Sequence, residues 1–455
     1  MSRTVLLWFR QDLRLADNPA LLAAVASGAR IVPVFLWSPE EEGDWPPGAA
    51  ARWWLHQSLQ VLSGRLASKG SRLIVRRGPA EEALARLARE TGADAVYWNR
   101  RYEPAAQAVE SALRVALPAL GIGVHSFQSA VLVEPWAIQT QGGGPYNVYT
   151  PFWRAWLKRA PPGPPAASPD RLEAPDVWPA SLALSDLSLL SGHSWNSKLA
   201  EVWQPGEASA HALLKRFVGD ALSGYATARD LPAVAGTSRL SPALHFGEVS
   251  PRQVWAAVGR ASAAKGEAGS SWQEGRFVAE LAWREFAAHV LHHNPWLPDR
   301  PKNAAFERLA WREDPEGLAA WTRGLTGFSL VDAGMRELWQ TGWMHNRVRM
   351  VVGSLLVKNL LVPWQSGERW FWDTLVDADL ASNALNWQWV AGTGPDAAPF
   401  FRIFNPESQA AKFDPEGLYR RRWVPEWGTS AYPSPIVDLR MSRERALKAY
   451  QETRA

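Results

Sequence analysis

The sequence predicts two domains: an α/β domain built on a parallel sheet, followed by a domain made only of helices. In the first third, short apolar runs alternate with helical segments. From Ala160 to about Gly206 the composition shifts to Pro, Ala and Ser, as in a connector. From Glu207 onward, almost every segment has helical periodicity and ends near Pro or Gly. At 455 residues the chain is too long for one ordinary core, so two or three domains are expected.

Five apolar runs predict the strands of the first domain. They are Val5–Phe9, Ile31–Trp37, Arg72–Arg76, Ala93–Trp98 and Val124–Phe127, and the helical segments between them are Ala20–Ala26, Ala49–Ser68, Ala80–Glu90 and Ala105–Leu117. This alternation predicts five parallel strands with helices on both faces, a Rossmann-like arrangement. We therefore expect an α/β domain at residues 1–135, an interdomain linker at 136–206 and a helical domain at 207–455, with no regular element between Ala160 and about Gly206.

The usual phosphate-binding motifs are missing from the sequence. The first strand-to-helix turn, Arg10–Asp17, lacks the G-x-G-x-x-G pattern, and the chain has no Walker A motif. The run Gly142-Gly-Gly144 is expected to be a loop. A standard dinucleotide site in the first turn is therefore not expected.

Composition excludes several classes of protein. A hydrophobic content of 47% with 21% charged residues is typical of globular proteins. The absence of cysteine excludes disulfides, iron–sulfur clusters and thiolate zinc sites. No apolar run reaches the roughly 18 residues of a membrane span, and the N-terminus does not resemble a signal peptide, so a cytoplasmic location is expected. A net charge of +4 and a pI near 9.3 permit an anionic partner such as DNA.

Small hydroxyl residues cluster before one predicted helix, in Ala235-Gly-Thr-Ser-Arg-Leu-Ser-Pro242. Ser241 is a good N-cap, and Pro242 suits the first helical position. A helix start of this kind can bind phosphate or pyrophosphate. Because similar caps occur in many helices without a ligand, both interpretations stay open here.

Two further stretches place polar groups beside aromatic or apolar residues. Glu280 and Trp283 lie three residues apart, on one face of a predicted helix. Arg347 and Arg349 fall on opposite faces, so one can be buried while the other faces solvent or DNA. A buried arginine requires a carboxylate, and the segment Asp377–Asp379 supplies two.

The stretch Leu385-Asn-Trp-Gln-Trp-Val-Ala391 places two tryptophans two residues apart. On a helix, Trp387 and Trp389 point about 200° apart, so one can face the core and the other a cavity. Asn383 precedes Trp387 by four residues and shares its face. Core packing is the ordinary alternative, since the chain has 27 tryptophans.

Together these segments resemble the DNA photolyase/cryptochrome family, from Trp8 to about Asp414. The resemblance is carried by Trp8-Phe-Arg-Gln-Asp-Leu-Arg14, Gly236-Thr-Ser-Arg-Leu-Ser241, Trp283-Arg-Glu-Phe286, Asp332-Ala-Gly-Met-Arg336, Gly342-Trp-Met-His-Asn-Arg347, Asp377-Ala-Asp-Leu380, Trp387-Gln-Trp389 and Phe401-Arg-Ile-Phe-Asn-Pro406. The family joins an α/β domain by a long linker to a helical domain that holds FAD.

The resemblance implies a set of flavin-binding residues: Tyr225, Thr237, Ser238, Arg239, Leu240, Ser241, Phe277, Arg349, Asp377, Ala378, Asp379 and Asn383. In the family, the residues at the positions of Asp377 and Asp379 contact the ribose and the isoalloxazine side of FAD. Arg349 corresponds to the buried partner of Asp377, and Asn383 to the residue that faces flavin N5. Three tryptophans correspond to the wire that photoreduces the flavin: Trp387 proximal, Trp364 intermediate and Trp311 at the surface.

The implied activity is that of a deoxyribodipyrimidine photo-lyase, a carbon–carbon lyase acting as a monomer on damaged DNA, associated with the nucleoid. Excited FADH⁻ donates an electron to a flipped-out cyclobutane pyrimidine dimer, whose ring opens before the electron returns. The resemblance places eight residues at the dimer or the DNA: Arg229, Glu280, Trp283, Asn346, Arg347, Met350, Trp389 and Gln409. Trp283 and Trp389 would be the walls, Glu280 would hydrogen-bond the damaged base, and Met350 would pack against it.

The same family includes two other functions, that of a cryptochrome photoreceptor and that of a (6-4) photolyase. A plant cryptochrome carries Asp where this chain has Asn383, and often Tyr in place of Trp389. Little chain follows Asp414 for a signalling tail. A (6-4) photolyase of the bacterial type needs cysteines, and the animal type has another histidine where Met350 stands. The segments Val133–Trp136 and Pro145–Trp153 favour a class III enzyme over class I.

Family members also bind an antenna chromophore, and methenyltetrahydrofolate or a deazaflavin is expected here. The Asn-Glu pair that holds folate in one subgroup falls on Ala105 and Ala106. Asn99, Arg101 and Glu103 lie nearby in the sequence. The identity and the site of the antenna stay open at this point.

Overall fold

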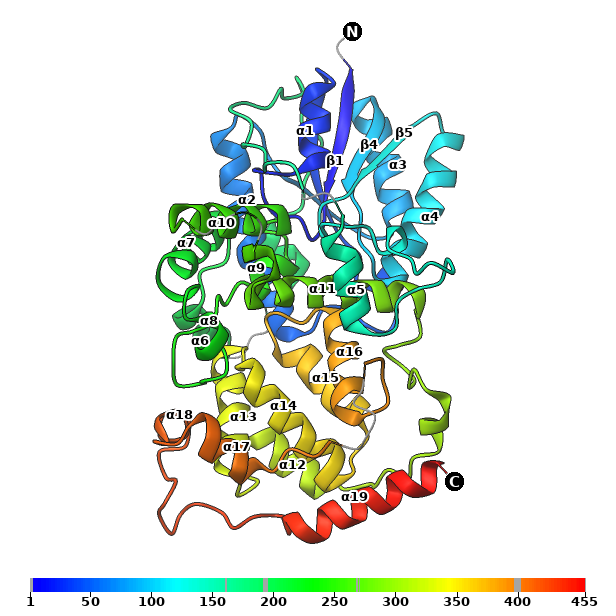
Figure 1. Cartoon of the computed structure of the whole chain (residues 1–455). Helices are drawn as coiled ribbons and strands as arrows, with labels where there is room; N and C mark the ends of the chain where they lie inside the picture. Colours follow the sequence, from blue (N-terminus) through cyan, green and yellow to red (C-terminus); the bar gives the residue numbers. More distant parts are fainter. Residues whose placement is uncertain are drawn as a thin grey trace.

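In the computed structural model the α/β domain lies at one end of the molecule and the helical domain at the other (Figure 1). The structure describes residues 3–159, 162–190, 195–266, 269, 271–396 and 402–454. The predicted segment Phe401–Pro406 therefore begins one residue outside the described part, and Ala160, the expected start of the connector, also lies outside it.

The first domain contains the predicted parallel sheet, with strand order β3-β2-β1-β4-β5. The strands are β1 (Thr4–Phe9), β2 (Arg30–Trp37), β3 (Ile74–Arg77), β4 (Ala93–Asn99) and β5 (Gly123–Phe127). Each prediction is confirmed within two residues, the third strand starting at Ile74 rather than Arg72.

Helices cover both faces of this sheet. They are α1 (Pro19–Ala26), α2 (Ala49–Ser68), α3 (Ala80–Thr91) and α4 (Pro104–Ala119). In β1, Val5, Leu7 and Phe9 pack with α1 and α2, while Leu6 and Trp8 pack with α3 and α4. Because both faces are covered, every residue of β1 is buried, as in a sandwiched parallel sheet.

The predicted linker contains two helices, and the expectation of no regular element between Ala160 and Gly206 is wrong for the second of them. Helix α5 (Tyr149–Leu157) packs on α11 (Arg276–His293), with Phe152 and Phe286 ring centroids 5.1 Å apart. Helix α6 (Trp195–Val202) buries Leu199 in the core between the domains. The buried aromatic face of α5 depends on contacts with α11, more than 100 residues away, and local composition does not show it. The domain boundaries themselves stay a prediction.

Among its described residues the second domain contains helices and the loops that join them, and no strand, as predicted. Its helices are α7 (Glu207–Arg216), α8 (Tyr225–Ala228), α9 (Ser241–His245), α10 (Pro251–Ala264), α11, α12 (Pro315–Arg323), α13 (Ser329–Thr341), α14 (Asn346–Ser354), α15 (Trp364–Thr374), α16 (Leu380–Ala391), α17 (Pro406–Phe413), α18 (Leu418–Trp423) and α19 (Leu439–Arg454), with π-helical η7 (Leu355–Leu360) continuing α14. One apolar core joins α12 to α16. The C-terminal helix α19 lies along the outer edge, far from the sheet (Figure 1).

Buried polar groups connect the two domains. The Glu207 carboxylate accepts hydrogen bonds from the backbone N–H of Leu15 (3.0 Å) and Ala16 (2.9 Å). Ser250 donates to Asp17 Oδ2 at 2.5 Å. These contacts hold the turn after β1 against the start of the helical domain.

Candidate functional site

A cavity of about 630 Å³ lies in the helical domain, between α14, α15 and α16. It is lined by Asn346, Arg349, Met350, Gly353, Phe371, Leu375, Asp377, Ala378, Asp379, Ser382, Asn383, Asn386, Trp387, Trp389 and Val390. Eight of these residues were predicted as flavin or substrate contacts, and Trp387 was predicted as the proximal tryptophan of the wire. The two tryptophans that lie two residues apart therefore line the same cavity from α16.

Asp377 connects three elements around this cavity. Arg349 Nη2 donates to both Asp377 oxygens, at 3.1 and 2.9 Å, which confirms the predicted pairing. Ser241 Oγ donates to Asp377 Oδ2 at 2.6 Å, so the hydroxyl loop is tied to the same carboxylate.

Asp379 is the N-cap of α16 and accepts a hydrogen bond from Ser382 N at 2.8 Å. Burial alone would raise the pKa of this carboxyl. His245, whose Nδ1 lies 3.8 Å from Asp379 Oδ2, and the Arg284 guanidinium outweigh that effect and hold the pKa well below its usual range. One short segment therefore supplies two carboxylates to the cavity: Asp377, which is paired with Arg349, and Asp379, whose pKa is low.

Asn383 lies one turn before Trp387 and is 9% exposed. Its Nδ2 donates to the backbone oxygen of Glu368 on α15 at 3.0 Å. The Glu368 side chain is fully buried, and among the described residues neither of its carboxyl oxygens has a hydrogen-bond partner. Burial raises the pKa of Glu368 well above its ordinary value, which favours its protonated form. Sequence reasoning did not identify Glu368, because its importance comes from burial and not from a motif.

The indoles of the predicted wire lie in or against one apolar core. Trp387 and Trp364 are 3% and 1% exposed, and Trp311 is partly buried at the edge of the core. A Cβ at Gly367 would lie 2.2 Å from Trp387 Cη2, so only glycine permits this approach of α16 to α15. Trp321, which sequence reasoning missed, is fully buried with its ring centroid 6.3 Å from that of Trp387.

The charged residues predicted at the substrate are paired in this structure. Arg229 donates to Glu280, and Arg347 Nη2 donates to Asp230 Oδ1 at 2.8 Å. The expected contrast between one buried and one solvent-facing arginine is not seen, because the side chains of Arg347 and Arg349 are 19% and 24% exposed and each has a carboxylate partner. Asp230, which follows α8, is the partner of Arg347. The alternative that one of the two faces DNA stays a prediction.

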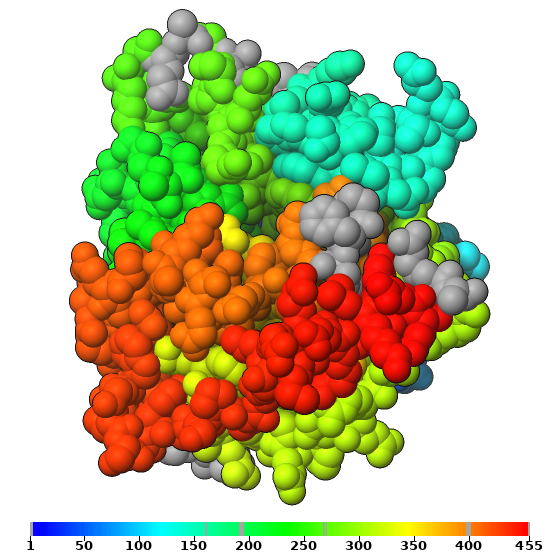
Figure 2. Space-filling view, turned by 60° about the horizontal axis from the view of Figure 1, so that its bottom comes forward, coloured from blue at the N-terminus to red at the C-terminus, as the bar shows by residue number. Residues whose placement is uncertain are grey.

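The predicted aromatic walls have different surroundings. Trp283 is partly buried and stacks on Tyr149, whereas Trp389 stacks at 6.2 Å on Phe404 beneath the Arg402 guanidinium. Gln409 is half-buried on α17, outside the residues that line the cavity. The space-filling view shows a recess on the face turned forward there, between segments coloured green, cyan and orange (Figure 2).

The hydroxyl loop, Thr237–Ser241, is held by an unusual contact. Arg239 has a left-handed backbone (φ 53°), and its guanidinium lies 4.4 Å and 4.8 Å from the ring centroids of Trp203 and Trp343. This sandwich fixes the loop beside the cavity. Tyr225 and Phe277 meet edge to face at 5.3 Å and line a separate hollow, so the structure does not bring them into the same cavity.

The cavity is suited to a flat heteroaromatic ring with a polar edge. Asn383 supplies an amide, Asp377 and Asp379 supply acceptors, Arg349 supplies a cation, and Trp387 supplies an aromatic wall. Such groups can orient the ring nitrogens of a flavin and the hydroxyls of its ribityl and ribose parts, so they fit FAD.

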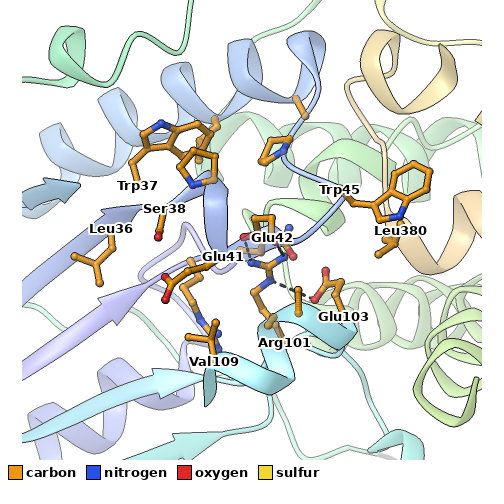
Figure 3. A pocket seen from close by; sticks show the side chains of 18 of the residues that line it. Leu36, Trp37, Ser38, Glu41, Glu42, Trp45, Arg101, Glu103, Val109 and Leu380 are labelled. Atoms are coloured by element: carbon orange, nitrogen blue, oxygen red, sulfur yellow. Dashed lines mark hydrogen bonds and ion pairs between the residues drawn. The ribbon is translucent and has the colours of Figure 1, made fainter. Parts of the chain in front are cut away.

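A second cavity, of about 1060 Å³, lies between the carboxyl ends of β1 and β2 and the helical domain (Figure 3). Its walls include Trp8, Trp37, Trp45 and Trp372, and Arg101 is bound inside it by Glu42 (2.6 Å) and Glu103 (3.2 Å). The wall atoms Trp8 Nε1, Ser38 Oγ, Trp45 Nε1 and His245 Nδ1 are buried and have no hydrogen-bond partner in the described part of the chain. A buried polar group without a partner is costly, so these four atoms indicate a polar ligand.

Ala105 and Ala106 also line this second cavity, together with Arg101 and Glu103. Asn99 does not line it, because its amide is already bound to Asp12 (2.5 Å) and Asn18 (2.7 Å). The described residues contain no cluster of three metal-ligating side chains. Nor does any described helix have both the length and the apolar character that a membrane span requires.

Comparisons with known proteins give a consistent result. The family model "DNA photolyase" matches residues 5–170, and "FAD binding domain of DNA photolyase" matches residues 277–431. The chain is 48% identical to a deoxyribodipyrimidine photo-lyase of Agrobacterium fabrum over 98% of this chain and 97% of that protein. It is 38% identical to cryptochrome-1 of Arabidopsis thaliana, over 98% of this chain and 70% of that protein.

Among solved structures, a bacterial class III photolyase from Agrobacterium tumefaciens superposes with a TM-score of 0.95 at 47% identity, covering 100% of this chain and 98% of that one. The sequence match covers 98% of this chain, the structural match covers 100%, and the family models cover much of each domain. The chain belongs to the DNA photolyase/cryptochrome family.

Proposed function

We propose that this protein is a light-dependent DNA repair enzyme, a deoxyribodipyrimidine photo-lyase that splits cyclobutane pyrimidine dimers. One observation carries the proposal: Trp387 and Trp389 line the same cavity as Asn383, Asp377 and Asp379. A flavin pocket and a wall for a damaged base thus lie together. The 48% identity to a photo-lyase supports the assignment.

In this proposal Asp377, Asp379 and Arg349 bind and orient FAD, and Asn383 faces its N5 atom. Ser241 and the loop held by Arg239 contribute from the opposite side. When bound and reduced, the flavin supplies a photoexcited electron donor. The chain supplies orientation, a dry aromatic wall and fixed charges.

The substrate residues would act on a dimer flipped out of the duplex, which costs a few kcal/mol, least for a damaged base. Trp283 and Trp389 would hold the apolar rings of the dimer, and Met350 would pack against it. Glu280 would exchange its contact with Arg229 for the damaged base and stabilise the charge that develops there. Asn346, Arg229, Arg347 and Gln409 would lie toward the DNA.

For photoreduction we propose the route Trp387, Trp364 and Trp311. The first two are buried in the core around the cavity, and Trp311 reaches the edge of that core. Indole is the most easily oxidised of the neutral aromatic side chains here, and partial exposure of Trp311 allows its radical to lose a proton to water.

The second cavity is the antenna site in this proposal, for methenyltetrahydrofolate or a deazaflavin. Its tryptophan walls suit a planar chromophore, and its four unpaired polar atoms suit a heterocycle with donors and acceptors. Ala378 and Leu380 line it on either side of Asp379, so only this segment separates it from the flavin cavity. A bound chromophore there would lie close to the flavin.

The decisive experiment is repair under light. The purified, reduced protein is mixed with DNA that contains thymine cyclobutane dimers and is illuminated with blue or near-UV light. Loss of dimers in the light and not in the dark is expected. A flavin-containing protein that leaves the dimers intact would favour a cryptochrome, and DNA with a (6-4) lesion, tested in parallel, distinguishes the third family activity.

The antenna is tested by its absorption. Purified protein, or protein reconstituted with methenyltetrahydrofolate, should show a near-UV band beyond the flavin spectrum. Trp45→Ala should remove that band and leave the flavin content unchanged, because Trp45 lines only the second cavity. An unchanged band in this variant would place the antenna elsewhere.

A further inference from the structure

Tyr149, at the start of α5, is stacked on Trp283 more closely than any other aromatic pair among the described residues. The two ring centroids are 3.7 Å apart and the planes differ by 7°. Tyr149 Oη also donates to the backbone oxygen of Ala279 at 2.6 Å. The tyrosine is thus attached to α11 at two points one turn apart, on either side of Glu280.

The same residue reaches the loop that follows the other predicted wall. Tyr149 N donates to Asp396 Oδ1 at 3.4 Å, and Asp396 lies seven residues after Trp389. Behind Tyr149, Trp153 stacks at 6.2 Å with planes 19° apart. The first turn of α5 therefore joins α11, which carries Trp283, to the chain that leaves α16.

Neighbouring rings restrain Trp283 on one face and at one edge. Tyr149 covers one side of the indole, and Phe286 meets it edge to face at 5.6 Å. An indole held this way cannot turn about its side-chain bonds without breaking the Tyr149 contact. A flat ligand can therefore stack only on the face opposite Tyr149.

We propose that Tyr149 is a positioning residue for the substrate pocket: it fixes the plane of Trp283 so that the opposite face receives the flipped pyrimidine dimer. This inference rests on the proposed function. It gives a role to the segment Pro145–Trp153, which lies in the predicted linker. Because the Trp283 ring is already held in place, dimer binding does not have to restrict its motion, and the entropic cost of binding is lower. Tyr149 is therefore expected to affect the affinity for the dimer and not the rate of electron transfer.

The test compares Tyr149→Leu, which removes the stack, with Tyr149→Phe, which keeps the ring. Tyr146→Leu is the matched control, since Tyr146 contacts Phe152 and not Trp283. Dissociation constants for dimer-containing and undamaged DNA are measured in the dark, together with flavin content and the repair rate at saturating DNA.

We expect Tyr149→Leu to weaken dimer binding about tenfold. Its affinity for undamaged DNA, its flavin content and its saturated repair rate should stay close to wild type. Tyr149→Phe and Tyr146→Leu should both keep the wild-type preference for dimers.

Two results would overturn the inference alone: a dimer preference that survives Tyr149→Leu, or an equal loss of affinity for both DNAs with loss of flavin, which indicates a general structural role. A wild-type protein that shows no preference for dimers would instead overturn the proposed function, and the role of Tyr149 with it.

Discussion

Single residues in the flavin cavity differ in charge because their surroundings differ. Asp377 is bound by Arg349 and Ser241, and the pKa of Asp379 is held low by His245 and Arg284. Glu368 lies only nine residues before Asp377, yet its carboxyl oxygens have no hydrogen-bond partner among the described residues and burial raises its pKa. Two carboxylates with strong partners thus line the cavity, and a carboxyl group with a raised pKa lies behind Asn383.

At the residue scale, Trp387→Phe should reduce photoreduction of the oxidised flavin to a small fraction of the wild-type rate. Phenylalanine is much harder to oxidise than tryptophan and breaks the proposed route at its first step. Repair by chemically reduced protein should be spared. The measurement is the bleaching of the flavin absorption under blue light with an external reductant.

Trp321→Phe is the matched control for this prediction. Trp321 is equally buried, contacts Trp387 and lies outside the proposed route, so it reports the effect of losing a buried indole. If both variants photoreduce equally well, Trp387 is not part of the wire.

Glu280→Ala tests the substrate side. Losing a hydrogen bond to a charged group costs about 1.5–3 kcal/mol, so repair should fall about tenfold or more. FAD should be retained, because Glu280 does not line the flavin cavity. Glu274→Ala, an exposed glutamate just before the same helix, should leave repair unchanged. Repair yield per absorbed photon and flavin content check the prediction, and a normal yield would remove Glu280 from the mechanism.

At the scale of elements, α11 is the central support of the site, because it carries Glu280 and Trp283 and contacts both domains. Its buried Glu285 accepts hydrogen bonds from Leu132 N, from Val133 N (3.1 Å) and from Trp156 Nε1 (2.7 Å). One side chain thus holds α5 and the chain after β5 against α11. Burial nevertheless raises the pKa of Glu285 to about 7.

This pKa predicts a pH dependence of stability. The folded-state pKa lies above the ordinary value of 4.5, so the protonated group stabilises the fold at pH 4.5 and below, and that contribution is lost as pH rises through 7. Glu285→Gln cannot ionise. Between pH 5 and pH 8.5, its free energy of unfolding should therefore improve relative to wild type by on the order of 2 kcal/mol.

Urea unfolding of both proteins at the two pH values measures the difference. Other titrating groups, including Glu248, are common to both proteins and cancel in the comparison. A difference in unfolding free energy that stays constant with pH would show that Glu285 is ionised throughout this range.

At the scale of the whole molecule, the two domains meet through backbone so close that no side chain fits. Gly247 has φ +65°, and a Cβ there would lie 2.2 Å from the backbone oxygen of Gln11. The turn after β1 and the end of α9 are thus in direct contact. This contact fixes the sheet relative to α9, which carries His245 and Ser241.

Gly247→Ala should destabilise the protein by clearly more than the ~1 kcal/mol that the left-handed backbone alone costs. The added methyl must push the two domains apart. Gly28→Ala is the control, because Gly28 has the same φ (+67°) and no atom within 4 Å of the added Cβ. Thermal unfolding and flavin retention of both variants check the prediction. Equal losses of stability in the two variants would show that the contact between the domains adjusts to the added methyl group at little cost.

Much of the fold follows from local sequence. The alternation of apolar strands with helical segments predicted all five strands within two residues, because strands buried on both faces are recognisable as continuous apolar runs. The spacing of Trp387 and Trp389 predicted that one indole faces the core and the other a cavity. Trp387 does belong to the core and Trp389 lies partly buried against it, but both line the cavity. The pairing of Arg349 with Asp377 followed from the rule that a buried cation needs an anion.

Tertiary structure alone decided which distant groups meet. The contacts of Glu280 with Arg229, Arg347 with Asp230 and Tyr149 with Trp283 join residues 51, 117 and 134 positions apart in the chain. Neither helical periodicity nor residue type encodes such pairings, since they depend on how whole helices pack. The sequence by itself determined the two domains, the residue types of the site and the family. Packing decided which carboxylate each arginine binds, which glutamates have raised pKa values and which face of Trp283 is covered.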